Sequence, residues 1–345
     1  MIASSIPPAA IMKYSKMVSK MLTIGLAGFG GIGQVHFSNY QHIADAKVSA
    51  ICDPSPKAQR AAEEKGIPYY ANLRSMLVEI KPDIVDVCTP SFLHHALVME
   101  ALRDGRHVIC EKPLALNSKD AKEMYTLAEQ QDVQLLVGHV LQFYPASKLL
   151  HEITRDGRYG KPLDAVFLRL SACPRWAAGG WLLDKSKSGL LPFDLHIHDL
   201  DLMISLFGKP ESFETVSGGR EGAGYEEYYR IFYRYPNLNV CCEAAWYNAE
   251  IPFTASWRVY FEKAVLIHEG GKLTAYSLDA PRKEFDIEEK LKIETGINLP
   301  PTGVFHEELS FFLDRIRSGE KEQYRREEII ALISILEDIT GENNE

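Results

Sequence analysis

The chain lacks the features that mark several large classes of protein. No apolar run in its 345 residues approaches the roughly 20 that cross a membrane, so we expect no membrane partner. The net charge of −9 provides no basic excess for a nucleic-acid surface, so we expect no nucleic-acid partner either. The six cysteines are scattered without a metal-type C-x-x-C pair, which suits a reducing compartment and predicts a cytoplasmic protein.

The chain is long enough for two domains, and its pattern changes near residue 140. Before that point, short apolar strands alternate with helical stretches, which predicts an α/β domain with a parallel sheet covered on both faces. From residue 163 the candidate strands are longer and more aromatic, which is typical of a meander in a largely antiparallel sheet. We therefore predict a flexible extension over residues 1–20, a nucleotide-binding domain over 21–140 and an α+β domain over 141–345.

A glycine-rich turn is the clearest motif of the first domain. After the strand 22–27 the chain matches G-x-G-x-x-G with Gly28, Phe29, Gly30, Gly31, Ile32 and Gly33, and a helical stretch follows. In this motif the glycines make a tight turn, let the backbone approach a pyrophosphate, and let the helix pack closely on the strand. Asp53 ends the next strand, where its carboxylate can accept both ribose hydroxyls and would repel a 2′-phosphate. This pattern predicts a site for NAD rather than NADP.

Polar residues follow three further strands of the predicted parallel sheet. Thr89-Pro90 and then His94 follow the strand 83–88, Glu111-Lys112-Pro113 follows 107–110, and Gly138-His139 follows 133–137. Ligands bind at the carboxyl ends of the strands in such sheets, so we expect these segments to face a cofactor. Each segment taken alone is also compatible with ordinary loop chemistry.

The stretch 190–207 has the pattern of a mostly buried helix that nevertheless carries charge. Its members Asp194, His198, Asp201 and Ser205 recur at a spacing that places them on one stripe. A carboxylate beside an imidazole raises the pKa of that imidazole, which makes Asp194 and His198 a candidate acid/base pair. The alternative is a pair that only orients the helix.

His196 and Asp199 lie on the same stretch and invite a metal-binding interpretation. Side chains two residues apart on a helix point in different directions, so His196 and His198 should not converge on one ion. We therefore predict no metal site.

Lys112 lies where a strand of the parallel sheet ends, near the expected nicotinamide end of the cofactor. An ammonium group there can hold a substrate oxygen and stabilise its developing negative charge. The alternative is an exposed lysine without a role, which is the usual fate of this residue type.

Taken together, these motifs resemble those of the glucose–fructose oxidoreductase and inositol dehydrogenase family (Gfo/Idh/MocA) over about residues 21–340. The resemblance is carried by the glycine-rich turn, by Thr89-Pro90 with His94, by Glu111-Lys112-Pro113-Leu114, by Gly138-His139, by Asp194, His198 and Asp201 in a D-x-x-x-H-x-x-D pattern, and by Glu308-Leu309 with Phe312. It implies a Rossmann domain followed by a domain with a large open-faced, mostly antiparallel sheet. It also implies NAD(P)-dependent oxidation or reduction of a sugar, inositol or related polyol, with Lys112, Asp194 and His198 in the catalytic roles.

We place the cofactor on the glycine-rich turn, Asp53, Thr89, Pro90, His94, Glu111 and Lys112. For the substrate we expect His139, Gln142, Asp194 and His198, together with Arg175, Trp176 and Trp181 from a loop whose aromatic faces suit a polyol. The two tryptophans are equally compatible with packing anchors. The chain departs from the family at Gln142, where arginine is frequent, and at Phe305, where tyrosine is common.

Two other activities are compatible with the same motifs. Some family relatives keep NAD bound and use it in a redox-neutral cycle, and a non-catalytic NAD-binding sensor is the second alternative. The aromatic-rich sheet of the second domain has more apolar surface than a few helices cover, so we expect a homodimer or homotetramer formed through that sheet.

Overall fold

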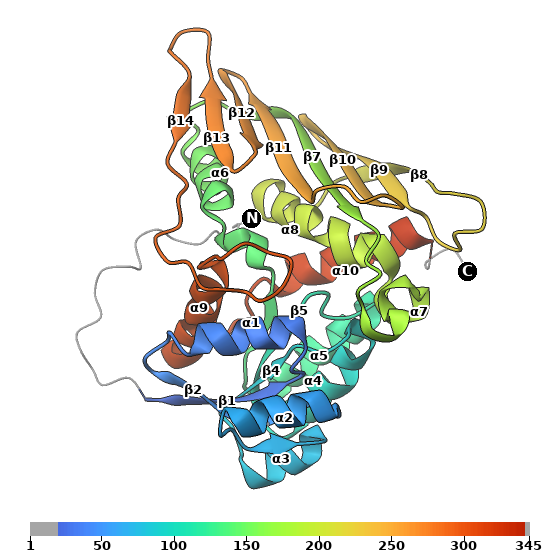
Figure 1. Ribbon diagram of the computed structural model, residues 1–345. Coiled ribbons are helices and arrows are strands. Elements are labelled where there is room, and N and C mark those ends of the chain that lie inside the picture. The colour runs from blue at the N-terminus through green and yellow to red at the C-terminus, as the bar shows by residue number, and fades with distance from the viewer. Residues whose placement is uncertain (1–19, 342–345) are drawn as a thin grey trace.

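The computed structural model describes residues 20–341. It consists of two domains, each built on one β-sheet, and helices from the second half of the chain pack against both (Figure 1). The first sheet has six parallel strands in the order β3-β2-β1-β4-β5-β6, as the alternating pattern predicts. Its strands are β1 (Leu22–Ala27), β2 (Ala46–Cys52), β3 (Tyr69–Tyr70), β4 (Ile84–Val87), β5 (His107–Glu111) and β6 (Leu135–Gly138). The extension expected over residues 1–20 lies, except for Lys20, outside the described residues.

Helices connect the strands of the first sheet and cover it. They are α1 (Gly31–Tyr40), α2 (Pro56–Glu64), α3 (Leu73–Glu79), α4 (His94–Arg103) and α5 (Ser118–Gln130). The second half adds α6 (Pro145–Asp156), α7 (Lys185–Ser188), α8 (Ile197–Phe207), α9 (Val304–Ser318) and α10 (Arg326–Thr340). Within residues 20–341, no helix combines the length and the apolar character needed to cross a bilayer.

The second sheet has eight strands in the order β14-β13-β12-β11-β7-β10-β9-β8 and is mostly antiparallel. Its strands are β7 (Pro162–Ala172), β8 (Ser212–Gly218), β9 (Tyr228–Tyr235), β10 (Leu238–Tyr247), β11 (Thr254–Phe261), β12 (Ala264–Glu269), β13 (Lys272–Tyr276) and β14 (Lys283–Phe285). The expected simple meander is wrong in one respect: β7 inserts between β11 and β10 and runs parallel to β10. The first strand of this domain is therefore its centre.

The stretch 190–207 begins differently from the predicted single α-helix. A π-helical turn, η4 (Pro192–His196), precedes α8. Helix α8 packs on one face of the second sheet, where Arg169 of β7 forms a buried bidentate ion pair with Asp199 at 2.7 and 2.9 Å. Within the described residues, no helix lies on the opposite face of this sheet (Figure 1).

Helix α9 ties the two halves of the chain together. Although it follows the second sheet in sequence, its apolar face joins the core formed by β1 and α1: Phe305, Leu309 and Phe312 cluster there with Ile24 and Val35. Helix α10 similarly packs on both α5 and α8. The second domain thus contributes directly to the packing around the predicted nucleotide site.

Candidate active site

The glycine-rich turn has the geometry that the motif predicts. Gly28 has a φ of +91°, and a Cβ atom there would lie 2.5 Å from the carbonyl oxygen of Cys88. A Cβ atom at Gly33 would lie 2.2 Å from the carbonyl oxygen of Gly28, so this glycine lets α1 approach β1. Beside Gly30 nothing lies within 4 Å of where a Cβ atom would stand, which leaves space for an approaching group.

The start of α1 suits a pyrophosphate. No side chain caps the helix at Gly30 and no acidic residue occupies its first turn, so its backbone N–H groups and dipole favour an anion. Asp53 follows β2, and its two carboxylate oxygens accept the backbone N–H groups of Phe29 and Ser55, each at 2.8 Å. These bonds hold the carboxylate beside the turn, where an adenosine ribose would lie. The residues present therefore fit a dinucleotide.

A loop from the second domain also reaches this site, which the sequence did not indicate. A Cβ atom at Gly31 would lie only 2.9 Å from Cγ2 of Ile297, a residue of the segment between β14 and α9. No motif in that segment points to α1, because the contact depends on how the two domains pack.

His94 lies at the predicted edge of the sheet but does not offer a free ring nitrogen. Its Nδ1 is 2.7 Å from the carbonyl oxygen of Pro113 and its Nε2 is 2.9 Å from that of Thr89. The ring is fully buried, and burial lowers its pKa. The prediction of direct cofactor binding by His94 is therefore corrected: both ring nitrogens face backbone carbonyl oxygens, and a neutral ring donates to one of them.

Lys112 and Asp194 meet across the two domains. Nζ of Lys112 donates hydrogen bonds to the carboxylate Oδ1 of Asp194 at 3.0 Å and to its backbone carbonyl oxygen at 2.7 Å. The two side chains are 15% and 28% exposed, so the pair is partly shielded yet accessible. An ammonium group has three N–H donors, and these two bonds leave one for a substrate oxygen.

His198 lies beside this pair without being bonded to Asp194. In the described part of the chain no hydrogen bond joins the two side chains, and Asp194 instead binds Lys112. Burial and the positive charges of Lys112 and Arg169 hold the pKa of His198 well below its usual value. The predicted role of Asp194 in raising the basicity of His198 is therefore wrong, because the ammonium group takes the carboxylate.

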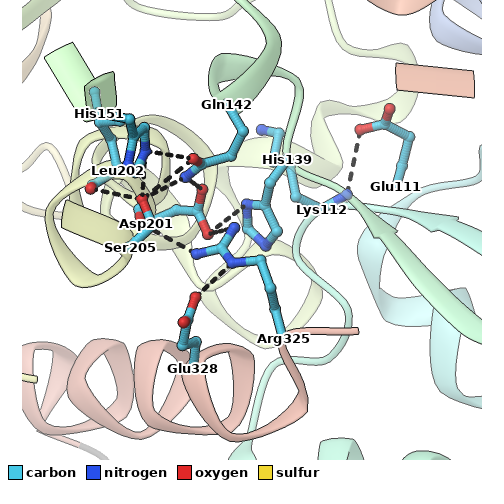
Figure 2. A network of polar contacts seen from close by, with 10 residues as sticks. All are labelled: Glu111, Lys112, His139, Gln142, His151, Asp201, Leu202, Ser205, Arg325 and Glu328. Carbon is cyan, nitrogen blue, oxygen red and sulfur yellow. Dashed lines mark hydrogen bonds and ion pairs between the residues drawn. The ribbon is translucent and has the colours of Figure 1, made fainter. Parts of the chain in front are cut away.

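The remaining members of the predicted stripe belong to a separate buried network (Figure 2). Asp201 accepts a hydrogen bond from Nε2 of Gln142 at 2.5 Å and forms an ion pair with Arg325 at 2.9 Å. The amide oxygen of Gln142 lies 3.2 Å from the hydroxyl oxygen of Ser205 and 3.1 Å from Nε2 of His151. Gln142 is thus satisfied inside the protein, and its prediction as a substrate residue is corrected.

Arg325 is the member of this network that sequence reasoning missed. It lies more than a hundred residues from Asp201, just before α10, and has a φ of +55°. Nothing local distinguishes it from the many exposed arginines of the chain. Only the packing of α10 on α8 shows that it neutralises Asp201.

His139 lies between this network and Lys112 (Figure 2). Its ring is 3% exposed, neither nitrogen has a hydrogen-bond partner, and Nδ1 is 3.6 Å from Oδ1 of Asp201. Burial lowers the pKa of this imidazole. A neutral ring with two unused nitrogens beside Lys112 remains a candidate for contact with a ligand.

The loop after β7 brings only one of its tryptophans to the first domain. The Trp181 ring lies 6.4 Å from that of Phe92 in the turn after β4, whereas Trp176 is 79% exposed. Arg175 bonds to Asn248 of the second domain. Trp181 is therefore the member of this loop best placed to border the site.

His196 and Asp199 each have a partner on the second sheet. Nε2 of His196 lies 2.7 Å from the hydroxyl of Tyr233, and Asp199 is paired with Arg169. Both side chains serve the contact between α8 and the second sheet.

Both halves of the chain match one family of known proteins. Residues 22–139 match the oxidoreductase family with an NAD-binding Rossmann fold, and residues 148–267 match the GFO/IDH/MocA C-terminal domain. The chain belongs to the Gfo/Idh/MocA family of oxidoreductases. The resemblance drawn from the motifs is thereby confirmed.

Several curated family members are similar in sequence. The chain is 33% identical to myo-inositol 2-dehydrogenase of Thermotoga maritima over 54% of its length, and 32% identical to D-glucoside 3-dehydrogenase of Escherichia coli over 57%. It is 27% identical to 2,7-anhydro-N-acetylneuraminate hydratase of Escherichia coli over 59%. The chain spans about half the length of these relatives, namely 55%, 57% and 55%.

Solved structures share the fold over nearly the whole chain. Levoglucosan dehydrogenase in complex with NADH and levoglucosan superposes with a TM-score of 0.78 at 21% identity, covering 94% of this chain and 98% of that one. An oxidoreductase from Agrobacterium radiobacter, solved with NAD+, L-tartaric acid and magnesium, gives 0.81 at 18% identity, covering 94% and 97%. At these identities the likeness shows the fold alone.

Replacing Asp53 by Asn should shift cofactor preference towards NADP. The change removes the charge that repels a 2′-phosphate while an amide oxygen still accepts a backbone N–H, so we expect the ratio of NADP to NAD affinity to rise about tenfold. Titration calorimetry with both cofactors measures this ratio. The exposed Glu64→Gln change on α2 removes the same charge and should leave the ratio unchanged; an equal shift in both variants would contradict the role of Asp53.

Proposed function

We propose that the chain is an NAD-dependent oxidoreductase that acts on a secondary alcohol carbon of a sugar, inositol or related polyol. The observation that carries this proposal is the meeting of Lys112 and Asp194 beside His198, at the carboxyl ends of the parallel strands next to the glycine-rich turn. Dinucleotide-binding sheets hold their ligands at that edge.

The cofactor would be held by the N-terminus of α1, by Asp53 and by the Thr89-Pro90 loop. When bound, NAD supplies the acceptor for the hydride that leaves the substrate carbon. Thr89 and Pro90 are both half-buried, and Oγ1 of Thr89 is buried without a hydrogen-bond partner. That hydroxyl is the polar group of the loop that a ligand could satisfy.

The proton of the substrate hydroxyl would pass to His198. A low pKa keeps the imidazole neutral near physiological pH, and a neutral ring has a nitrogen lone pair that accepts a proton. Lys112 would hold the same oxygen with its third N–H and stabilise its negative charge as the proton leaves. Asp194 then acts by orienting Lys112 rather than by charging His198.

The substrate class follows from the surroundings of this group. Lys112, His139 and His198 offer polar contacts to several hydroxyls, and Trp181 offers an aromatic face. The relatives named after inositol, a glucoside and an anhydro-sugar acid act on hydroxylated rings, which supports a ligand of this kind.

Turnover should depend on His198. With inositols, hexoses and sugar acids tested against NAD, absorbance of the reduced cofactor identifies a substrate. Replacing His198 by Ala should then lower kcat by about 10²- to 10⁴-fold, the range of general acid/base catalysis, with little change in NAD affinity. His95→Ala on α4, outside the site, is the matched control. Full turnover of the His198 variant would show that His198 is not the base.

The hydratase among the relatives makes a redox-neutral cycle the second candidate. In that case the purified protein should carry NAD through turnover, and no polyol should yield net reduced cofactor. Mass spectrometry of the purified protein separates this activity from a dehydrogenase. Binding of NAD without any turnover would instead indicate a sensor.

The acid limb of the pH profile should report on Lys112. Since the Lys112 charge helps to lower the pKa of His198, Lys112→Met should raise that pKa towards its ordinary value of 6.5. A base must be deprotonated to act, so the acid limb of kcat/KM should lie below pH 6.5 in the wild type. In the variant this limb should move to higher pH, and the residual rate should be lower. Lys119→Met on the exposed side of α5 should leave the limb in place. An unmoved limb in the Lys112 variant would show that His198 is not the titrating group.

We also propose that the open face of the second sheet forms a homodimer or homotetramer. Adjacent strands align Tyr260, Val265 and Tyr276 on this face, and Phe232 is 45% exposed there. Light scattering should give a multiple of the 38.9 kDa chain mass, and Val265→Glu should reduce it. Glu64→Lys on α2 serves as the control, and a monomeric wild type would contradict the interface.

A further inference from the structure

Four ionisable side chains from four elements meet in the interior next to the glycine-rich turn. They are His36 of α1, Asp86 of β4, Glu111 of β5 and Glu308 of α9. Their exposed fractions are 0%, 0%, 8% and 0%. None of them enters the proposed proton transfer, and buried charges of this kind are costly unless they are paired.

His36 pairs with two of the carboxylates. Its Nδ1 lies 2.8 Å from Oδ2 of Asp86, and its Nε2 lies 3.1 Å from Oε1 of Glu111. A ring between two carboxylates donates to both only when both nitrogens carry a proton. Burial opposes the charged ring, but the neighbouring Cys88 and Asp86 side chains together hold the pKa of His36 well above its usual value.

Glu308 is the exception in this cluster, because neither of its oxygens has a hydrogen-bond partner. One of them lies within 4.8 Å of both a ring nitrogen of His36 and a carboxylate oxygen of Glu111. Burial raises the pKa of Glu308 well above its usual value; Glu111, Asp86 and Asp201 add to this effect and His36 opposes it. A neutral carboxyl has one O–H donor, and the Glu111 carboxylate is within the span of one bridging water.

Glu111 transmits this contact to the proposed catalytic lysine. Its Oε2 accepts the backbone N–H of Lys112 at 3.2 Å, so the Glu111 side chain helps to hold the Lys112 backbone. Gly138 of β6 makes room for the carboxylate, since a Cβ atom there would lie 3.0 Å from Oε1 of Glu111.

We propose that Glu308 is a positioning residue of the active site, which keeps its proton and is linked to the Glu111 carboxylate through one bridging water, so that α9 of the second domain helps to hold Lys112 in place. This inference rests on the proposed function for the role of Lys112, but the protonation of Glu308 does not. Helix α9 of the second domain thereby maintains the position of Lys112 in the first domain.

Two other interpretations are possible for Glu308. Its side chain only fills space in the core, or it is a ligand of a metal ion together with His36 and Glu111. They differ in what the side chain must supply. A protonated acid is replaced well by Gln, which is neutral and donates a hydrogen bond. Packing is replaced equally well by Met, and a metal ion held by carboxylates binds more weakly when one of them becomes the neutral amide of Gln.

The kinetic test compares Glu308→Gln with Glu308→Met. We expect the Gln variant to keep kcat within about threefold and the Met variant to lose about 10- to 100-fold in kcat, the scale of a misplaced catalytic group, with a smaller change in KM. Glu307→Met, one residue away on the exposed side of α9, is the control. Full activity of Glu308→Met would overturn the proposal, as would loss of activity in a folded Glu308→Gln.

A second test needs no substrate and separates this inference from the proposed function. A carboxyl whose pKa is raised in the folded state stabilises the fold at low pH and loses that contribution as the pH rises above its unfolded value, near 4.5, towards the folded value. The wild-type folding equilibrium constant should therefore fall relative to that of Glu308→Gln by up to tenfold per pH unit in this window. Urea unfolding at a series of pH values measures the difference. Parallel curves for the two proteins would overturn the proposal, and so would a stoichiometric metal ion found by elemental analysis of the wild type and lost in Glu308→Gln.

Discussion

The contact between Lys112 and Asp194 is the interaction on which the site depends. It joins the end of β5 in the first domain to the π-helical turn before α8 in the second, with the ammonium group bonded to a carboxylate and a carbonyl of the same residue. Partial burial strengthens such a pair relative to one in open water, because fewer solvent dipoles screen it. It directs Lys112 towards the edge of the sheet, and it removes Asp194 from His198.

The acidic residues of the stretch 190–207 each find a cation from a different part of the chain. Asp194 forms an ion pair with Lys112, the residue after β5. Asp199 pairs with Arg169 of β7, and Asp201 pairs with Arg325, which precedes α10. Burial, and then the positive charges of Lys112 and Arg169, lower the pKa of His198 rather than raise it. The stretch thus forms three ion pairs with three distant segments, and His198 takes part in none of them.

Much of this architecture can be predicted from local patterns in the sequence. The alternation of apolar strands and helices predicted the parallel sheet, and G-x-G-x-x-G predicted the turn at Gly28 and the close packing at Gly33, because these depend on residues near one another in sequence. The second sheet was predicted as largely antiparallel, but the central place of β7 was not, since strand order depends on long-range pairing. The edge strands β8 and β14 contain mostly polar residues and carry little periodic signal.

By itself the sequence determined the family, the dinucleotide turn and the residues from which a site could be built. The tertiary structure decided which of those residues meet. Helical spacing alone placed Asp194, His198, Asp201 and Ser205 on one stripe, yet their partners arrive from β5, η2 (Val140–Phe143) and the segment before α10. A charge in a protein interior is governed by the nearest opposite charge, and that neighbour is set by the packing of distant segments rather than by the local chain.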